Sequence, residues 1–179
     1  MHDKSIVVAA QAGAEWAWDR LYRSVAPQIR GFLIGRGAED PDGLLGDVFL
    51  DAARNINRFE GSEADFRSWI FTIARRRLID ERRRRARRPT SELGDAREPV
   101  DPQDVEVTAI ASARLGEMLS ILDVLTEQQR EVLLLRMISD LSLAETATAM
   151  DKSISAVKVL QHRAIARLRR AIERQEVTL

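Results

Sequence analysis

The sequence FRSWIFTIARRRLIDERRRRARR at residues 66–88 carries the strongest pattern in the chain. Its apolar residues recur at helical spacing, so one face of a helix can pack on a core; they are Phe66, Ile70, Ile73 and Ala74, widened by Trp69, Phe71 and Leu78. Ten arginines against two acidic residues crowd the rest of its surface. Arginine neutralises phosphates and aromatic rings stack on unpaired bases, so the stretch predicts a nucleic-acid surface. A solvated helix end that runs into a linker is the alternative interpretation.

Two further helices and a loop are predicted before this stretch. The first helix covers Glu15–Arg36, and Pro27 either kinks it or separates two helices. The second runs from about Leu44 to Ile56 with a wide apolar stripe, and we expect its opposite face to expose Asp47, Asp51 and Arg54. Residues 57–65, NRFEGSEAD, read as a loop because Gly61 and Ser62 interrupt the periodicity.

The composition changes after Pro89, which is expected to end the basic helix. From Ser91 to Ala111 six acidic residues face one arginine, and large apolar residues are almost absent. Such a segment predicts a flexible or extended linker. The sequence therefore divides into an N-terminal domain at residues 1–90, a linker at 91–111 and a C-terminal domain at 112–179. We expect an all-α fold with two small helical domains.

The C-terminal part predicts a helix-turn-helix. Thr126 with Gln129 and Ser142 with Glu145 each form a capping box, and each opens a helix. A tight turn at residues 151–152 follows, and Ser153 caps a longer basic helix. The second helix of this motif enters a major groove with its N-terminal residues. The candidates for contacts to base edges and phosphates are Ser155, Lys158, Val159, His162 and Arg163. An αα-hairpin inside a helical domain is the alternative.

The whole-chain composition excludes several classes of protein. The 179 residues contain no cysteine and only two histidines, which excludes disulfides and a zinc site. We find no catalytic constellation and no Gly-rich phosphate loop, so the sequence predicts neither an enzyme nor a cofactor. No apolar run reaches the length of a membrane span, and no convincing signal peptide is present, so we expect no membrane insertion and a cytoplasmic location. Two basic domains on one tether suit a protein that binds two places on one nucleic acid.

Three motifs resemble the sigma factors of bacterial RNA polymerase, specifically the extracytoplasmic-function (ECF) group. FRSWIFTIARRRLIDERRRR is similar to the family's Phe-Arg-x-Trp-Leu-x-x-Ile-Ala-Arg-x-x-x-Ile-Asp-x-x-Arg-Arg. LLGDVFLDAA, at residues 44–53, is similar to its Asp-Leu-Val-Gln-Glu-Val-Phe-Leu-x-Ala. The third motif is LTEQQREVLLLRMISDLSLAETATAM followed by SAVKVLQHRAIARLR. The resemblance covers roughly residues 14–172 and implies sigma region two, a linker and a helix-turn-helix sigma region four.

The resemblance implies a role for each part. The helix at 44–53 would bind the β′ clamp helices of core RNA polymerase, with Leu44, Leu45, Asp47, Val48 and Asp51 as candidates. The loop and the start of the basic helix would capture the minus-ten element, with Arg58, Phe59, Arg67, Trp69, Arg75 and Arg76 as candidates. The last helix would read the minus-thirty-five element, and the C-terminal domain would meet the β flap. In this group an anti-sigma factor commonly wedges between the two domains, so the resemblance raises such a partner as an expectation.

Two other functions compete with a promoter-specificity subunit. A stand-alone helix-turn-helix regulator would use the same last helix, but it leaves the LLGDVFLDAA surface and the aromatic basic helix unexplained. A nucleic-acid enzyme would need a catalytic constellation that we do not find. Binding to duplex DNA without polymerase would favour the regulator.

Overall fold

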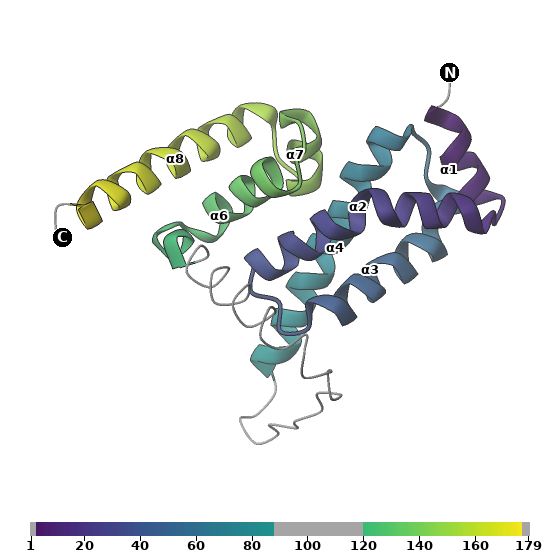
Figure 1. Ribbon diagram of the computed structural model, residues 1–179, viewed down its shortest axis with the longest axis horizontal. Helices are drawn as coiled ribbons and strands as arrows, with labels where there is room; N and C mark the ends of the chain where they lie inside the picture. The colour runs from purple at the N-terminus through teal and green to yellow at the C-terminus, as the bar shows by residue number, and fades with distance from the viewer. Residues whose placement is uncertain (1–2, 88–119, 177–179) are drawn as a thin grey trace, which may run out of the picture.

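The computed structural model describes residues 3–87 and 120–176, and the described residues form helices and no strand (Figure 1). The N-terminal domain contains α1 (Asp3–Gln11), α2 (Glu15–Gly35), α3 (Pro41–Asn55), a 3₁₀ turn η1 (Ile56–Arg58) and α4 (Glu63–Arg87). The C-terminal domain contains η2 (Ile121–Val124), α6 (Glu127–Leu133), η3 (Leu134–Ile138), α7 (Leu143–Met150) and α8 (Ile154–Glu176). The predicted all-α fold is confirmed. The predicted linker at 91–111 lies outside the described residues.

The core of the N-terminal domain lies between α2, α3 and α4. Phe32 and Phe71 are fully buried and meet edge to face with ring centroids 5.8 Å apart. The helix predicted at Glu15–Arg36 is confirmed as α2, which continues through Pro27 without a break, so the alternative of two helices joined at this proline is wrong. The α3 helix begins at Pro41, earlier than predicted, because the Asp40 side chain caps it by accepting a hydrogen bond from the Gly43 amide at 2.9 Å.

The sequence analysis missed α1. Ile6, Val7 and Ala10 on this helix are buried against the domain. The Gln11 side chain then donates hydrogen bonds to the carbonyl oxygens of Ile56 at 2.9 Å and Phe59 at 2.8 Å. The first helix therefore holds the short segment that leads into the basic helix α4.

The local signals of the C-terminal domain are confirmed. Both capping boxes form, and in each the side chain at the third helical position accepts a hydrogen bond from the backbone amide of the cap residue. The turn between α7 and α8 has Asp151 in the left-handed region with φ 53°, which aspartate tolerates better than most residues. The predicted helix as far as Ile138 is α-helical only to Leu133, and η3 is a π-helical turn.

The two domains pack against each other along α4 with α7 and along α2 with η3 (Figure 1). Gly31 and Gly35 lie one turn apart on α2 and make room for η3. A Cβ at Gly31 would lie 2.9 Å from Ile138 Cγ2, and one at Gly35 would lie 2.6 Å from Leu134 Cδ2. We call these four residues the glycine notch. The close approach of α2 and η3 is therefore possible because glycine has no Cβ at these two positions.

Candidate nucleic-acid and polymerase surfaces

A shallow pocket of about 240 Å³ lies where the loop before α4 meets the helix. Phe59 and Trp69 form its aromatic part, with ring centroids 4.9 Å apart, and buried Phe66 supports Trp69 at 5.6 Å. Arg58 and Arg76 add positive charge, and Asn55 and Ile73 complete the lining. An unpaired base can stack on the half-buried rings while the guanidinium groups meet phosphates. We call this site the aromatic pocket.

The structure brings four of the six predicted minus-ten residues to the aromatic pocket: Arg58, Phe59, Trp69 and Arg76. The other two contact the C-terminal domain instead. Arg67 donates to the carbonyl oxygen of Ser139 at 2.8 Å, and Arg75 Nε donates to Glu131 Oε1 at 2.7 Å. The sequence analysis missed Asn55 as a pocket residue, and no sequence signal identified it, because its place depends on how α3 ends beside α4.

The α3 residues predicted to bind polymerase fall into two groups. Leu44, Leu45 and Val48 are buried in the core, so they position the helix, whereas Asp47 is half-buried. The expectation that Asp51 is exposed is wrong, since the residue is only 6% exposed. Its position one turn after Asp47 brings it under α4, and the arginines of α4 cover it.

The Asp51 carboxylate is held by two arginines of α4. Arg77 Nε donates to it at 2.7 Å, and Arg76 Nη2 donates at 3.0 Å. The hydrogen bond from Arg77 lowers the pKa of the Asp51 carboxyl below its usual value and outweighs the opposing effect of burial. This ion pair joins α3 to α4 beside the aromatic pocket, because Arg76 belongs to both.

An apolar patch on α2 and α3 was not predicted. The rings of Tyr22 and Phe49 contact at a tilt of 52° with centroids 4.7 Å apart, and Tyr22 is 45% exposed. Leu50, the next residue on α3, is 56% exposed. Leu50 lies outside the predicted apolar stripe of its helix, and this position could have indicated from the sequence that its side chain is exposed. Exposed apolar groups beside Asp47 are typical of a protein-binding surface.

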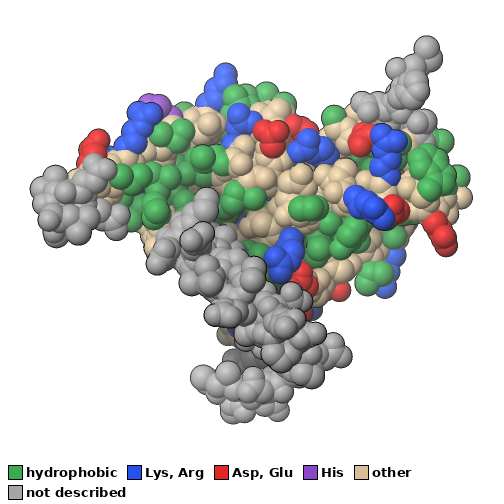
Figure 2. All heavy atoms as spheres, in the orientation of Figure 1, with side chains coloured by type: hydrophobic (Ala, Val, Ile, Leu, Met, Phe, Trp, Pro, Cys, Tyr) green, Lys and Arg blue, Asp and Glu red, His purple; other side chains and the backbone are tan. Residues whose placement is uncertain are grey.

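The five residues predicted on the last helix are all exposed on α8: Ser155, Lys158, Val159, His162 and Arg163. Val157 and Ala164 are fully buried on the opposite side, so packing fixes which face is presented. Figure 2 shows Lys and Arg side chains along the edge of the molecule over α8. A basic exposed face on the second helix of the motif can enter a DNA groove.

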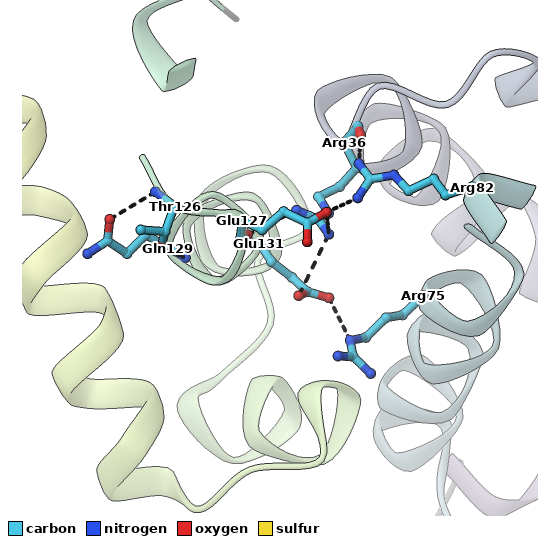
Figure 3. A network of polar contacts seen from close by, with 7 residues as sticks. All are labelled: Arg36, Arg75, Arg82, Thr126, Glu127, Gln129 and Glu131. Carbon is cyan, nitrogen blue, oxygen red and sulfur yellow. Dashed lines mark hydrogen bonds and ion pairs between the residues drawn. The ribbon is translucent and has the colours of Figure 1, made fainter. Parts of the chain in front are cut away.

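A polar network that the sequence analysis missed joins the two domains (Figure 3). Glu131 of α6 points toward Arg75 and lies 4.0 Å from Arg36, and Glu127 pairs with Arg36 at 3.3 Å and with Arg82. The side chains of Arg36 and Glu131 are each only 4% exposed. Burial lowers the pKa of the Arg36 guanidinium, and the Glu131 carboxylate opposes that effect. We call these five residues the interdomain network.

Within the described ranges, no group of three or more histidine, cysteine or acidic residues is arranged to hold a metal ion. None of the helices that the structure describes is both long enough and apolar enough to cross a membrane.

Comparison with known proteins gives matches to both domains. The family model "Sigma-70 region 2" matches residues 21–88, and "Sigma-70, region 4" matches residues 121–170. The ECF RNA polymerase sigma factor BldN of Streptomyces coelicolor is 35% identical over 173 residues, and the match covers 93% of this chain and 64% of BldN. SigD of Mycobacterium tuberculosis, also named an ECF RNA polymerase sigma factor, is 30% identical, and the match covers 92% of this chain and 81% of SigD.

Two solved structures have the same fold. CnrH, solved in complex with the cytosolic domain of CnrY, superposes with a TM-score of 0.70 at 25% identity and covers 97% of this chain and 98% of its own. The sigma factor RpoE of Bartonella quintana, solved with the anti-sigma factor NepR, gives a TM-score of 0.61 at 22% identity and covers 87% of this chain and 96% of its own. The similarity to CnrH extends over both domains.

Proposed function

The chain belongs to the ECF group of RNA polymerase sigma factors, and from this membership we propose how its surfaces divide the work of a promoter-specificity subunit. The observation that carries the proposal is the aromatic pocket in the region-two domain. Phe59 and Trp69 offer stacking faces there, with Arg58 and Arg76 beside them. The pocket takes an unpaired base of the minus-ten element, and stacking of about 1–3 kcal/mol per base offsets the cost of unstacking it. Promoter melting then needs no catalytic group on this chain.

The test of this function is run-off transcription. Core RNA polymerase alone should give no specific transcript from a genomic promoter library, and the added protein should give transcripts from a defined set. A stand-alone regulator would instead bind duplex DNA tightly without polymerase and would leave transcription by core polymerase unchanged. The two family matches in order favour the sigma factor, since they account for both domains.

Polymerase binding is assigned to α3 and its neighbour α2. Half-buried Asp47 lies on the same helix as half-buried Phe49 and exposed Leu50, and Tyr22 of α2 contacts Phe49, so a carboxylate and apolar side chains are presented together. We infer that this surface meets the β′ clamp helices, while the C-terminal domain meets the β flap. Core polymerase and promoter DNA are in the cytoplasm, and we assign the protein to that compartment. Buried Leu44, Leu45 and Val48 act by holding α3 in place.

Asp47→Arg is expected to weaken binding to core RNA polymerase about tenfold, because a reversed charge at a complementary interface is repelled. Affinity measured by fluorescence anisotropy of the labelled protein tests this. Asp42→Arg is the control, since Asp42 is exposed on the same helix and its pairing with Arg30 is a surface ion pair. Equal affinities for the parent and Asp47→Arg, with unchanged helical circular dichroism, would remove Asp47 from the interface.

Lys158→Ala is expected to weaken binding to minus-thirty-five duplexes of every sequence about equally, because a phosphate contact carries no sequence information. The slope of log affinity against log salt should fall by about 1 for the one phosphate lost. The measurement is the affinity of the holoenzyme for the cognate minus-thirty-five duplex and for a scrambled duplex, each titrated at several salt concentrations. A loss confined to the cognate sequence would make Lys158 a base-reading residue instead.

An anti-sigma factor is the further partner that we propose. The RpoE structure holds such a partner, and exposed Tyr22 and Leu50 with half-buried Phe49 give this chain an apolar surface that a partner can cover. Purification from the source cell with and without stress tests the proposal. Recovery of the protein with polymerase alone, and with full transcription activity, from unstressed cells would contradict it.

A further inference from the structure

The α8 helix has one face that points directly away from the core of its domain. Val157 and Ala164 are fully buried, and at about 3.6 residues per turn their directions around the helix axis differ by only about 20°. The direction opposite to this pair therefore marks the centre of the outward face. Ser155, Val159 and His162 lie within about 30° of that centre, and all three are exposed. We call these three residues the central row.

A pair of cations borders the central row on each side. Lys158 and Arg169 lie about 50–70° from the centre of the outward face on one side. Arg163 and Arg170 lie at about the same angles on the other side, and all four residues are exposed. A helix in a major groove has a phosphate backbone on each side and base edges in front of it. The arrangement therefore directs long cationic side chains toward the two backbones and the shorter central row toward the bases.

Val159 is the apolar member of the central row, and it is 47% exposed. Single apolar residues on a surface are common, so exposure alone assigns no role to this valine. The other two large apolar residues that are exposed on α8, Ile154 and Ile172, lie about 110° from the centre of the outward face, beside the buried side. In the part of α8 whose side chains the structure describes, Val159 alone directs a large apolar side chain outward between cations.

The chemistry of valine limits what it can recognise on a base edge. Its side chain has no hydrogen-bond donor or acceptor, so it cannot pair with a base nitrogen or oxygen. The apolar group that base pairs present in the major groove is the C5-methyl group of thymine. Against any other base edge, Val159 would take water away from a polar atom without replacing its hydrogen bond. Both effects favour thymine opposite Val159.

An acidic residue limits how much of α8 can lie against DNA. Glu173 lies near the centre of the same outward face, about 21 Å further along the helix than Val159, and it is exposed. A carboxylate at that place is repelled by phosphates, whereas the row that contains Val159 lies in the first turns of the helix. The N-terminal part of α8 is therefore the part that faces base edges.

We propose that Val159 reads a thymine of the minus-thirty-five element by contact with its C5-methyl group, while Lys158 and Arg163 on its two sides hold α8 in the major groove. This role rests on the function proposed above, because it needs the C-terminal domain to bind that element as duplex DNA. Loss of one methyl group from such a contact should weaken binding about three- to fivefold.

Deoxyuridine tests this role, because it differs from thymidine only by the absent methyl group. The holoenzyme first selects duplexes from a library randomised across the minus-thirty-five region. The selected element is then made with deoxyuridine in place of each thymidine in turn, and one of these substitutions should weaken binding by the parent about three- to fivefold. With Val159→Ser the same substitution should make almost no difference, because no apolar contact remains to be lost.

Two further variants separate a lost contact from a disturbed helix. Val159→Thr keeps the branched shape and one methyl group, so it should keep part of the response to deoxyuridine. Ile172→Ser is the matched control, since it removes an apolar side chain of similar exposure from another side of α8. It should respond to deoxyuridine as the parent does.

The response to deoxyuridine should be the same at low and at high salt, because a methyl contact releases no counterions, unlike the phosphate contact of Lys158. A selected element with no thymidine on either strand, or one in which no deoxyuridine weakens the parent, would overturn the role of Val159. So would a response that Val159→Ser retains in full. Each of these outcomes leaves the sigma function intact, whereas a parent holoenzyme that selects no element and starts no transcription would reject that function.

Discussion

Trp69→Ala is expected to weaken binding of minus-ten single strands to the holoenzyme roughly 10- to 100-fold, because base stacking on an aromatic ring contributes about 1–3 kcal/mol. Trp69 is half-buried and packs in a triangle with Phe59 and Phe66, with ring centroids at 4.9 Å and 5.6 Å from its own and 6.0 Å between the two phenylalanines. Its removal takes away one of the two rings that line the aromatic pocket. Fluorescence anisotropy of a labelled oligonucleotide gives the affinity, and the heparin-resistant open complex gives the effect on melting.

Trp16→Ala provides a matched control for the same chemical change. Trp16 is 58% exposed at the start of α2 and does not line the aromatic pocket. Trp69→Phe should retain most of the affinity, because a smaller ring still stacks. If Trp69→Ala and Trp16→Ala bound the minus-ten strand equally well, the base would have to lie elsewhere.

Asp51→Ala is expected to lower the free energy of unfolding by about 2 kcal/mol, because it removes two charge-assisted hydrogen bonds between α3 and α4. The loss stays below that for a fully buried pair, since the side chains of Arg76 and Arg77 are 63% and 24% exposed and return to water. Urea unfolding measures the change. Asp47→Ala, one turn earlier and less buried, should cost much less; equal losses would contradict the structural role of Asp51.

The same carboxylate makes the stability of the N-terminal domain depend on pH. The pKa of Asp51 is lower in the folded chain than the usual 3.8, so the unfolded chain binds its proton first as the pH falls. Its contribution to stability is therefore complete above that usual value and is lost as the pH falls through the folded value. Asp51→Ala should lack this part of the acid sensitivity, and unfolding curves measured between neutral and acidic pH will show it.

Local sequence signals predicted most of the fold. Two capping boxes and the apolar periodicity from Phe66 to Leu78 depend only on neighbouring residues, and the structure confirms them. The exposure of Asp51 was predicted wrongly because periodicity gives the face of α3 and not which helix covers it. Asp51 is buried because Arg76 and Arg77 of α4 pair with it. The spacing of residues along α3 cannot show that these arginines lie there.

The contact between the domains could not be predicted for a related reason. The structural role of Gly31 and Gly35 is to let Ile138 and Leu134 approach α2, and these partners lie about a hundred residues away along the chain. Glu131 was a weak signal, since it is an acidic residue beside the apolar residues 132–135 of α6 and η3. An acidic residue in that position predicts that a cation is buried beside it. Only the tertiary structure shows which arginines supply that cation.

The glycine notch joins two parts of a single chain, so its strength follows the rules of an intramolecular contact. A complex between two proteins dissociates when the molecules become scarce, whereas an intramolecular contact experiences the same effective concentration at any copy number. The packing of α2 against η3 is therefore independent of the number of copies of the protein that are present.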